Sequence, residues 1–196
     1  MRTRDNVKEL LVKQQAIELI VQEGFQGFSM NKLAKACDIS VATLYIYYQD
    51  KEDLIREIGM EIGKNFFHEM LKGFSPDKPF KDGLKQQWIN RSGFALKYPK
   101  EVACFEIIRH SSHGDYILTE SLREFKNSME IFFTNAVNRK ELKPVSLEVF
   151  WSIAYGPLYA LLRFHSEGKS ISGKPFKFSR KLMEEAFELV IKALTP

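Results

Sequence analysis

The chain has 196 residues, of which 44% are hydrophobic and 28% charged, as in a soluble globular protein. Its length allows one sizeable core, or a small domain joined to a larger one. The net charge of +4 is too small to indicate by itself a protein that binds polyanions.

The cysteine content and the hydropathy exclude two further classes. Cys37 and Cys104 lie far apart with no CxxC pair, so we expect reduced thiols and no disulfide framework. The first residues carry no apolar run typical of a signal peptide. The longest uncharged stretch, 149–162, has fourteen residues, whereas a membrane span needs about 20. We expect a cytoplasmic protein that does not contact a membrane.

The first predicted helix follows a short basic arm at residues 1–5. Asn6 and Glu9 have the spacing of a capping box, and Gly24 is a stop signal. This helix should support the short helices after it. Its expected buried face consists of Val7, Leu10, Leu11, Ala16, Ile17, Ile20 and Val21.

A short helix and a tight turn are predicted next. Ser29 is a good N-cap for a helix through Cys37, in which Leu33 and Ala36 lie three positions apart and share a buried face. Residues 37–39 form the turn, where Asp38 tolerates a left-handed backbone.

The second short helix is predicted over residues 41–48, capped by Ser40. Leu44 and Tyr48 share one stripe and should face the core. The outer surface then has small, apolar and aromatic side chains without an acid, which suits a helix that reads the DNA major groove. The outer residues are Val41, Ala42, Thr43, Ile46 and Tyr47.

This stretch resembles the N-terminal signature of tetracycline-repressor (TetR) family regulators. The matching motifs are Gly24-Phe25, Leu33-Ala34, Ile39-Ser40, Thr43-Leu44-Tyr45, Tyr47-Tyr48 and Lys51-Glu52-Asp53-Leu54. The resemblance implies an operator-binding helix-turn-helix. Two positions depart from the family pattern, because Asp38 replaces the usual glycine of the turn and Val41 replaces a usually polar residue.

The resemblance also implies roles for individual residues. Val41 and Ala42 would meet base edges, and Asn31 would reach the groove. The phosphate contacts would be Thr43, Tyr45, Tyr47 and Lys51. The full set of candidate DNA-binding residues is Ser29, Asn31, Val41, Ala42, Thr43, Tyr45, Ile46, Tyr47 and Lys51.

A long helix is predicted to start after Asp50, its N-cap, with Asp53 at the third position. Its apolar positions are Leu54, Ile55, Ile58, Ile62, Phe66 and Leu71. At five turns or more it should link an N-terminal domain, residues 1–50, to a larger helical domain, residues 51–196. A rigid helix across two domains would transmit movement from one to the other.

The rest of the chain is predicted to be helical, with a loop at 74–83. The expected helices cover 84–98, 99–110, 116–140, 146–168 and 180–194. Pro157 should kink or break the fourth of these, which is apolar on two sides. Since no stretch alternates as a strand would, we predict an all-α protein: a three-helix helix-turn-helix domain joined by a long helix to a ligand-binding and dimerisation domain.

Two residue sets follow from the resemblance to family members with an effector cavity and a four-helix dimer interface. The candidate effector residues are Trp88, Arg91, Phe94, Phe105, Ile108, Phe132, Trp151 and Tyr155, which could equally be core. Arg91, Arg109 and His110 would allow an anionic group at the edge. The candidate dimer residues are Phe150, Leu158, Leu161, Met183, Phe187 and Val190.

The sequence and its resemblance favour a homodimeric regulator, a repressor controlled by an unknown small molecule and bound to double-stranded DNA at an inverted repeat. The alternative is a DNA-bound scaffold whose C-terminal domain binds a protein. An enzyme would need a nucleophile with its base, or a metal cluster, and the sequence shows neither. His110 and His113 in HSSHGD are too few for a metal site, so we expect neither metal nor cofactor.

Overall fold

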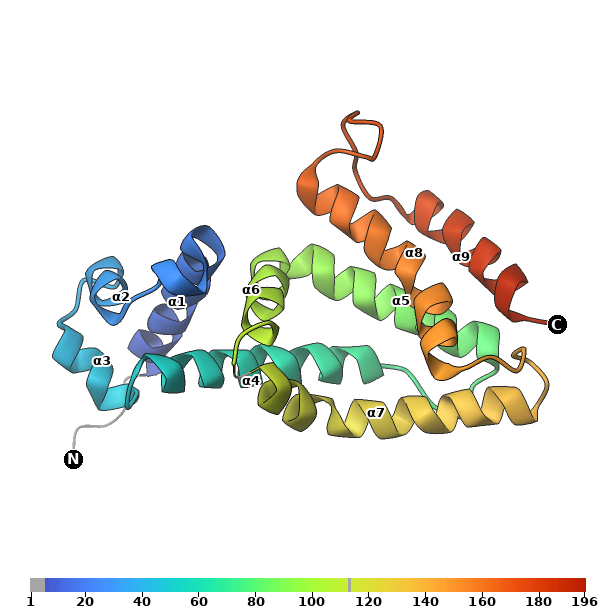
Figure 1. Ribbon diagram of the computed structural model, residues 1–196, viewed down its shortest axis with the longest axis horizontal. Coiled ribbons are helices and arrows are strands. Elements are labelled where there is room, and N and C mark those ends of the chain that lie inside the picture. Colours follow the sequence, from blue (N-terminus) through green and yellow to red (C-terminus); the bar gives the residue numbers. More distant parts are fainter. Residues whose placement is uncertain (1–5, 113) are drawn as a thin grey trace. The chain divides into compact units, whose positions relative to one another are not determined.

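The computed structural model describes residues 6–112 and 114–196 and consists, over those residues, of nine α-helices with one isolated β-bridge (Figure 1). The all-α prediction is confirmed. The predicted basic arm and His113 lie outside the described residues, as does the side chain of Asn6. The helices are α1 Asn6–Gly27, α2 Met30–Ala36, α3 Val41–Tyr47, α4 Lys51–Leu71, α5 Phe80–Lys97, α6 Pro99–Arg109, α7 Gly114–Asn138, α8 Leu147–Glu167 and α9 Arg180–Leu194.

The chain forms two compact units. Unit 1 comprises residues 1–67 and 98–123, and unit 2 comprises residues 68–97 and 124–196. The helices α4 and α7 therefore each begin in unit 1 and end in unit 2. The domain division after residue 50 stays a prediction, and in this grouping α6 and most of α4 join the N-terminal helices.

Helix α1 buries a narrower face than predicted. Val12, Ala16 and Ile20, spaced by four, are buried at 1% exposure or less. Val7 and Leu10 are exposed because, at 100° per residue, they lie roughly opposite that stripe. Leu11 is also exposed, so the prediction was wrong at these three positions. The helix continues past Gly24, where a left-handed residue with φ of 70° makes a kink instead of an end.

Unit 1 is held together by ion pairs as well as by its core. Lys13 of α1 pairs with Glu61 of α4 at 2.7 Å, and Lys100 of α6 pairs with Glu18 of α1. Close approach of helices is needed at Gly63 of α4, where an added Cβ would lie 2.5 Å from Oγ of Ser121. Helix α6 begins at Pro99 as predicted, because proline suits the first turn of a helix.

Helix α5 begins at Phe80, four residues before the predicted start. The carboxylate of Glu141 accepts a hydrogen bond from the Phe80 backbone N–H at 2.7 Å. This contact caps the helix across 61 residues of sequence. Consequently the predicted loop at 74–83 is wrong over its last four residues.

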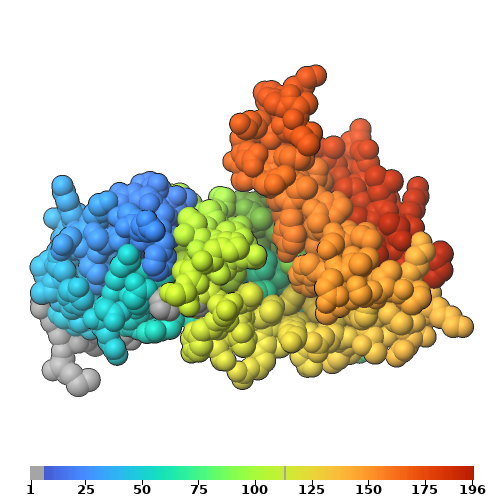
Figure 2. Space-filling model, viewed as in Figure 1, coloured from blue at the N-terminus to red at the C-terminus, as the bar shows by residue number. Residues whose placement is uncertain are grey.

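Helices α8 and α9 pack against each other in unit 2 (Figure 1). Ser146 caps α8 and Ser179 caps α9, each through a bond from a backbone N–H three residues on. The backbone of α8 stays helical through Pro157, so the predicted broken turn does not form. Between them, a segment with a left-handed Gly168 and a fully exposed Ile171 projects from unit 2 (Figure 2).

None of the described helices is both long enough and apolar enough to span a membrane.

Candidate nucleic-acid interface

Two capped helices and a tight turn build the helix-turn-helix. The Ser29 hydroxyl accepts from the backbone N–H of Lys32, and the Ser40 hydroxyl accepts from that of Thr43 at 3.1 Å. Between them Asp38 has a φ of 52°, the left-handed conformation expected of a turn residue. The turn closes with a bond of 3.0 Å from the N–H of Ile39 to the carbonyl of Ala34.

One side of this motif is anchored in the core. Leu33 and Leu44 are fully buried, and Tyr48, the residue that ends α3, is 1% exposed. These positions match the predicted inner stripe. Ala36 is exposed, and Ala34 takes its place beside Leu33, so the predicted pairing of Leu33 with Ala36 was wrong. Because Leu44 and Tyr48 are buried, the opposite face of α3 points towards solvent.

The outward face of α3 is apolar and aromatic and carries no acid. Tyr45 is 52% exposed and Ile46 is 67% exposed, and Ala42 lies open beside them. Val41, Thr43 and Tyr47 are half-buried, as is Ser29, whereas Asn31 of α2 is exposed. The Thr43 hydroxyl lies 2.9 Å from that of Ser40. All predicted contact residues of α2 and α3 are therefore at least partly accessible.

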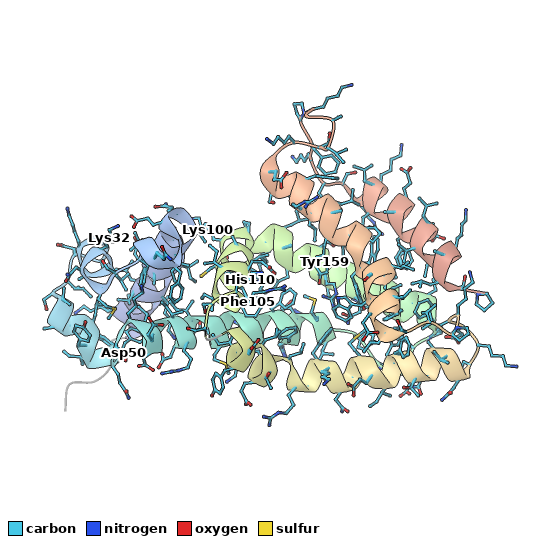
Figure 3. The ribbon with its side chains drawn as sticks, viewed as in Figure 1. Lys32, Asp50, Lys100, Phe105, His110 and Tyr159 are labelled. Carbon is cyan, nitrogen blue, oxygen red and sulfur yellow. The ribbon has the colours of Figure 1, made fainter. Side chains whose placement is uncertain are left out.

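The lysines near this face differ in the hydrogen bonds and ion pairs that their ammonium groups already make within the chain. The Lys51 ammonium donates to the carbonyl of Phe25 at 3.1 Å and lies 4.9 Å from the ring centroid of Phe25. Lys32 pairs with Glu23 and the carbonyl of Gly27 (Figure 3). Lys35 has no ion-pair partner among the described side chains. Sequence reasoning did not select Lys35, although its exposed position on α2 was readable from the helix period.

The start of α4 is fixed by two aspartates. The Asp50 carboxylate accepts from the N–H of Asp53 at 2.7 Å, and the Asp53 carboxylate accepts from the N–H of Gln49 at 3.0 Å. The Gln49 bond and Arg56, at 2.8 Å, hold the pKa of Asp53 below its ordinary value of 3.8. The predicted Asp50 cap at the start of α4 is therefore present.

Both cysteines are buried, which disfavours their thiolate forms. Burial raises the pKa of Cys37, and it raises the pKa of Cys104 to about 12 with a smaller contribution from Glu101. Neither thiol is in a disulfide. No three His, Cys, Asp or Glu side chains in the described part of the chain converge as metal ligands.

The predicted effector residues divide between the two units. Phe105 and Ile108 lie in unit 1, where Phe105 stacks on Phe66 with ring centroids 6.5 Å apart. Arg109 and His110, also in unit 1, are exposed, whereas Arg91 in unit 2 is buried. All the predicted effector residues except Trp151 are buried; those in unit 2 are Trp88, Arg91, Phe94, Phe132, Trp151 and Tyr155.

The residues predicted for the dimer interface lie on the inner faces of α8 and α9. Phe150, Leu158, Met183, Phe187 and Val190 are at most 6% exposed within the single chain, and Leu161 is half-buried. Such side chains pack the core of unit 2 and have little surface to offer a partner. The dimer interface stays a prediction, and within the single chain the predicted stripe of α8 is the one that unit 2 buries.

Comparison with known proteins matches this geometry to one family. Residues 14–58, which span the helix-turn-helix and the start of α4, match the model for bacterial regulatory proteins of the tetR family. A TetR family transcription regulator from Marinobacter aquaeolei VT8 is 26% identical, with a TM-score of 0.82 over 99% of this chain and 98% of that one. The helix-turn-helix region of this chain therefore matches the TetR family, and the fold of the whole chain is similar to that of a TetR family regulator.

Further regulators are similar to this chain. An uncharacterised HTH-type transcriptional regulator of Haemophilus influenzae is 32% identical over 41% of this chain and 43% of its own. YuxN of Bacillus subtilis, another such regulator, is 30% identical over 57% of this chain and 45% of its own. The chain thus spans less than half the length of these two relatives. A TetR family protein from Vibrio parahaemolyticus shares the fold, with 23% identity and a TM-score of 0.74 over 96% of this chain and 99% of its own.

Proposed function

We propose that this chain is a sequence-specific, DNA-binding transcriptional regulator that presents α3 to the major groove. The proposal depends on the outward face of α3, which carries no acidic residue and lies opposite the buried side chains of Leu44 and Tyr48. Its lack of carboxylates suits a surface that lies against phosphates. The match of residues 14–58 to the TetR family model supports the same assignment.

Each exposed residue has a role in this proposal. Val41 and Ala42 contact base edges, and with few hydrogen-bonding groups they favour thymine methyls and an A/T-leaning half-site. Asn31 pairs with an adenine at the edge of the groove. Phosphates are contacted by Ser29, Thr43, Tyr45, Tyr47 and Lys51, and Ile46 packs against the sugar edges. To contact a phosphate, the Lys51 ammonium must either break its hydrogen bond to the Phe25 carbonyl or donate to both acceptors.

We propose that the regulator is a homodimer. The apolar stripe of α8 that unit 2 leaves accessible supports this, with Val149 45% exposed and Ile153, Pro157, Ala160 and Phe164 half-buried. Two copies of α3 on one face of a duplex need a separation of about 34 to 36 Å, one helical turn. The operator is accordingly an inverted repeat.

The long helix α4 supports control of DNA binding by a small molecule. This helix of 21 residues is continuous, and its two ends belong to different units. A ligand that shifts its last turn would change the position of its first turn beside α3. We expect the regulator to repress transcription, because a protein that occupies a promoter is enough to block it. We also expect it to act in the cytoplasm.

Selection of bound sites from random duplex DNA, at two salt concentrations, tests the DNA-binding proposal. The expected result is an A/T-leaning inverted repeat whose binding weakens steeply with salt. Val41→Ala should change the selected sequence, whereas Tyr45→Phe should weaken binding to all sequences about equally. Lys64→Ala, which removes an exposed cation elsewhere on α4, is the control. Sequence-blind binding by the wild type, or an unchanged site for Val41→Ala, would contradict the assignment.

A further inference from the structure

Unit 2 buries a positive charge that no carboxylate neutralises. Arg91 of α5 is 2% exposed, and no acidic side chain among the described residues pairs with it. Aromatic rings surround it instead. The guanidinium carbon lies 4.2 Å from the ring centroid of Tyr155, 5.3 Å from those of Phe125 and Trp151, and 5.8 Å from that of Tyr159. A buried charge without a counter-ion is costly, so its retention calls for an explanation.

The hydrogen bonds of this cluster are incomplete. Nη1 of Arg91 donates to the Tyr159 hydroxyl, and Nη2 donates to Oε1 of Gln87 at 3.5 Å, the upper limit for such a bond. Nε of Arg91 and the hydroxyl of Tyr155 are fully buried and make no hydrogen bond of good geometry with a described residue, although the Arg91 side chain lies close enough to act on that hydroxyl. A guanidinium has five N–H donors, so most of them are still available.

Aromatic contacts alone do not account for these unused donors. A ring face attracts the delocalised charge, but it does not satisfy an N–H that points along the guanidinium edge. Burial raises the pKa of Tyr155 to about 12, against the opposing effects of the Arg91 charge and of hydrogen bonding from Arg91 to the hydroxyl oxygen, which leaves the O–H itself free to donate. Its hydroxyl therefore keeps its proton at neutral pH and is a further donor. Nε–H and this hydroxyl are two unused donors in one aromatic cluster.

The cluster reaches the surface of unit 2 through α8. Trp151 is 37% exposed and Tyr159 is 40% exposed, so the two rings separate Arg91 from solvent. Tyr159 lies on the side of α8 that faces α5 (Figure 3). An acceptor stronger than a phenol hydroxyl, such as an ionised carboxylate, would compete for the Arg91 donor that Tyr159 now occupies.

We propose that Arg91 and Tyr155 bind the carboxylate of a small organic monoanion, whose apolar or aromatic body packs against Trp151 and Tyr159. A carboxylate has two oxygens that match the edge of a guanidinium, and a single charge that one guanidinium neutralises. A phosphate dianion would be left with one uncompensated charge in a buried site. The proposal rests on the proposed function, since it names the chemical class of the effector.

Binding of three probes to the full chain, without DNA, tests the proposal. The probes are benzoate, its neutral isostere benzamide, and inorganic phosphate, compared at constant ionic strength by thermal melting and by tryptophan fluorescence, which Trp151 should report. Benzoate is expected to bind saturably and to raise the melting temperature. Benzamide and phosphate are expected to bind at least tenfold more weakly.

Three variants separate a ligand-binding role from a structural one. Arg91→Met keeps the length of the side chain and should weaken benzoate binding at least tenfold without lowering the melting temperature of the unliganded protein. Tyr155→Phe removes only the hydroxyl and should weaken binding severalfold, and it serves if Arg91→Met fails to fold. Arg123→Met makes the same charge change at a side chain that is 76% exposed and should leave binding unchanged.

The proposal is overturned if benzoate does not bind, if benzamide binds equally well, or if Arg91→Met and Tyr155→Phe bind benzoate like the wild type. Since the assay contains no DNA, such a result leaves the site selection unaffected. Conversely, failure to select an operator would leave benzoate binding intact.

Discussion

Two glycines of α5 occupy opposite environments, and replacing each with alanine measures how tightly unit 2 is packed. A Cβ added at Gly83 would lie 2.4 Å from Cε2 and 2.7 Å from Cζ of Phe132. A Cβ added at Gly93 would meet nothing within 4 Å. Both residues are inside the same helix, so the gain in helix propensity is common to both variants.

The expected magnitudes follow from these contacts. Alanine in place of glycine stabilises a helix interior by about 1 kcal/mol, which is the whole effect expected at Gly93. Overpacking a core costs about 1–3 kcal/mol. The Phe132 ring also contacts the rings of Phe74 and Phe80, with centroids 5.2 Å and 5.9 Å away, so moving it aside would disturb both contacts. Gly83→Ala should therefore be less stable than Gly93→Ala by about 1–3 kcal/mol.

Urea unfolding followed by far-UV circular dichroism, at one protein concentration, provides the measurement. Gly93→Ala should raise the free energy of unfolding, and Gly83→Ala should leave it unchanged or lower it. In a thermal scan, the melting temperature should shift by about 2–4 °C for each kcal/mol of change in stability. Equal free energies for the two variants would refute the reasoning, because they would mean that the contact with Phe132 costs nothing.

Three further predictions concern pH, reactivity and assembly. Asp53→Asn loses the ion pair with Arg56; because the folded pKa of Asp53 is lowered, the wild type should melt higher at pH 7, and this advantage should vanish as the pH falls below 3.8. Cys104, whose pKa is raised to about 12, should resist iodoacetamide at pH 8 in the native protein, as mass spectrometry would show. Ile153→Glu should convert a dimer of twice the 22.8 kDa chain mass into a monomer in light scattering, whereas Ser152→Glu, on the exposed side, should not.

Each of these predictions has an outcome that contradicts it. An Asp53→Asn difference that stays constant down to pH 2 would show that the carboxylate charge contributes nothing. Rapid alkylation of native Cys104, at the rate seen in urea, would mean that the thiol is accessible. A dimer that survives Ile153→Glu would exclude the accessible stripe of α8 as the interface.

Short-range signals predicted the helix-turn-helix well. Ser29, Ser40 and Asp50 act as caps through bonds to N–H groups three residues on, and such contacts depend only on local sequence. The left-handed turn at Asp38 and the buried stripe of Leu44 and Tyr48 have the same local origin.

Errors arose where distant residues decide the structure. The start of α5 depends on Glu141, which no local pattern connects to Phe80. Which of the two apolar stripes of α8 is buried within the chain depends on α5 and α9, which lie far away in the sequence. The burial of Arg91 contradicts the usual preference of arginine for solvent, so only the assembled unit reveals it.

The cap that joins Glu141 to Phe80 has a consequence for synthesis on the ribosome. The two residues are 61 positions apart, and at about 5–20 residues per second the interval between them lasts roughly 3–12 s. Throughout that time α5 lacks its cap, and Phe80, Leu84 and Trp88, all fully buried at the end, have no α8 to cover them. The nascent chain therefore exposes the apolar side chains of α5 for seconds, and these are a suitable target for a chaperone.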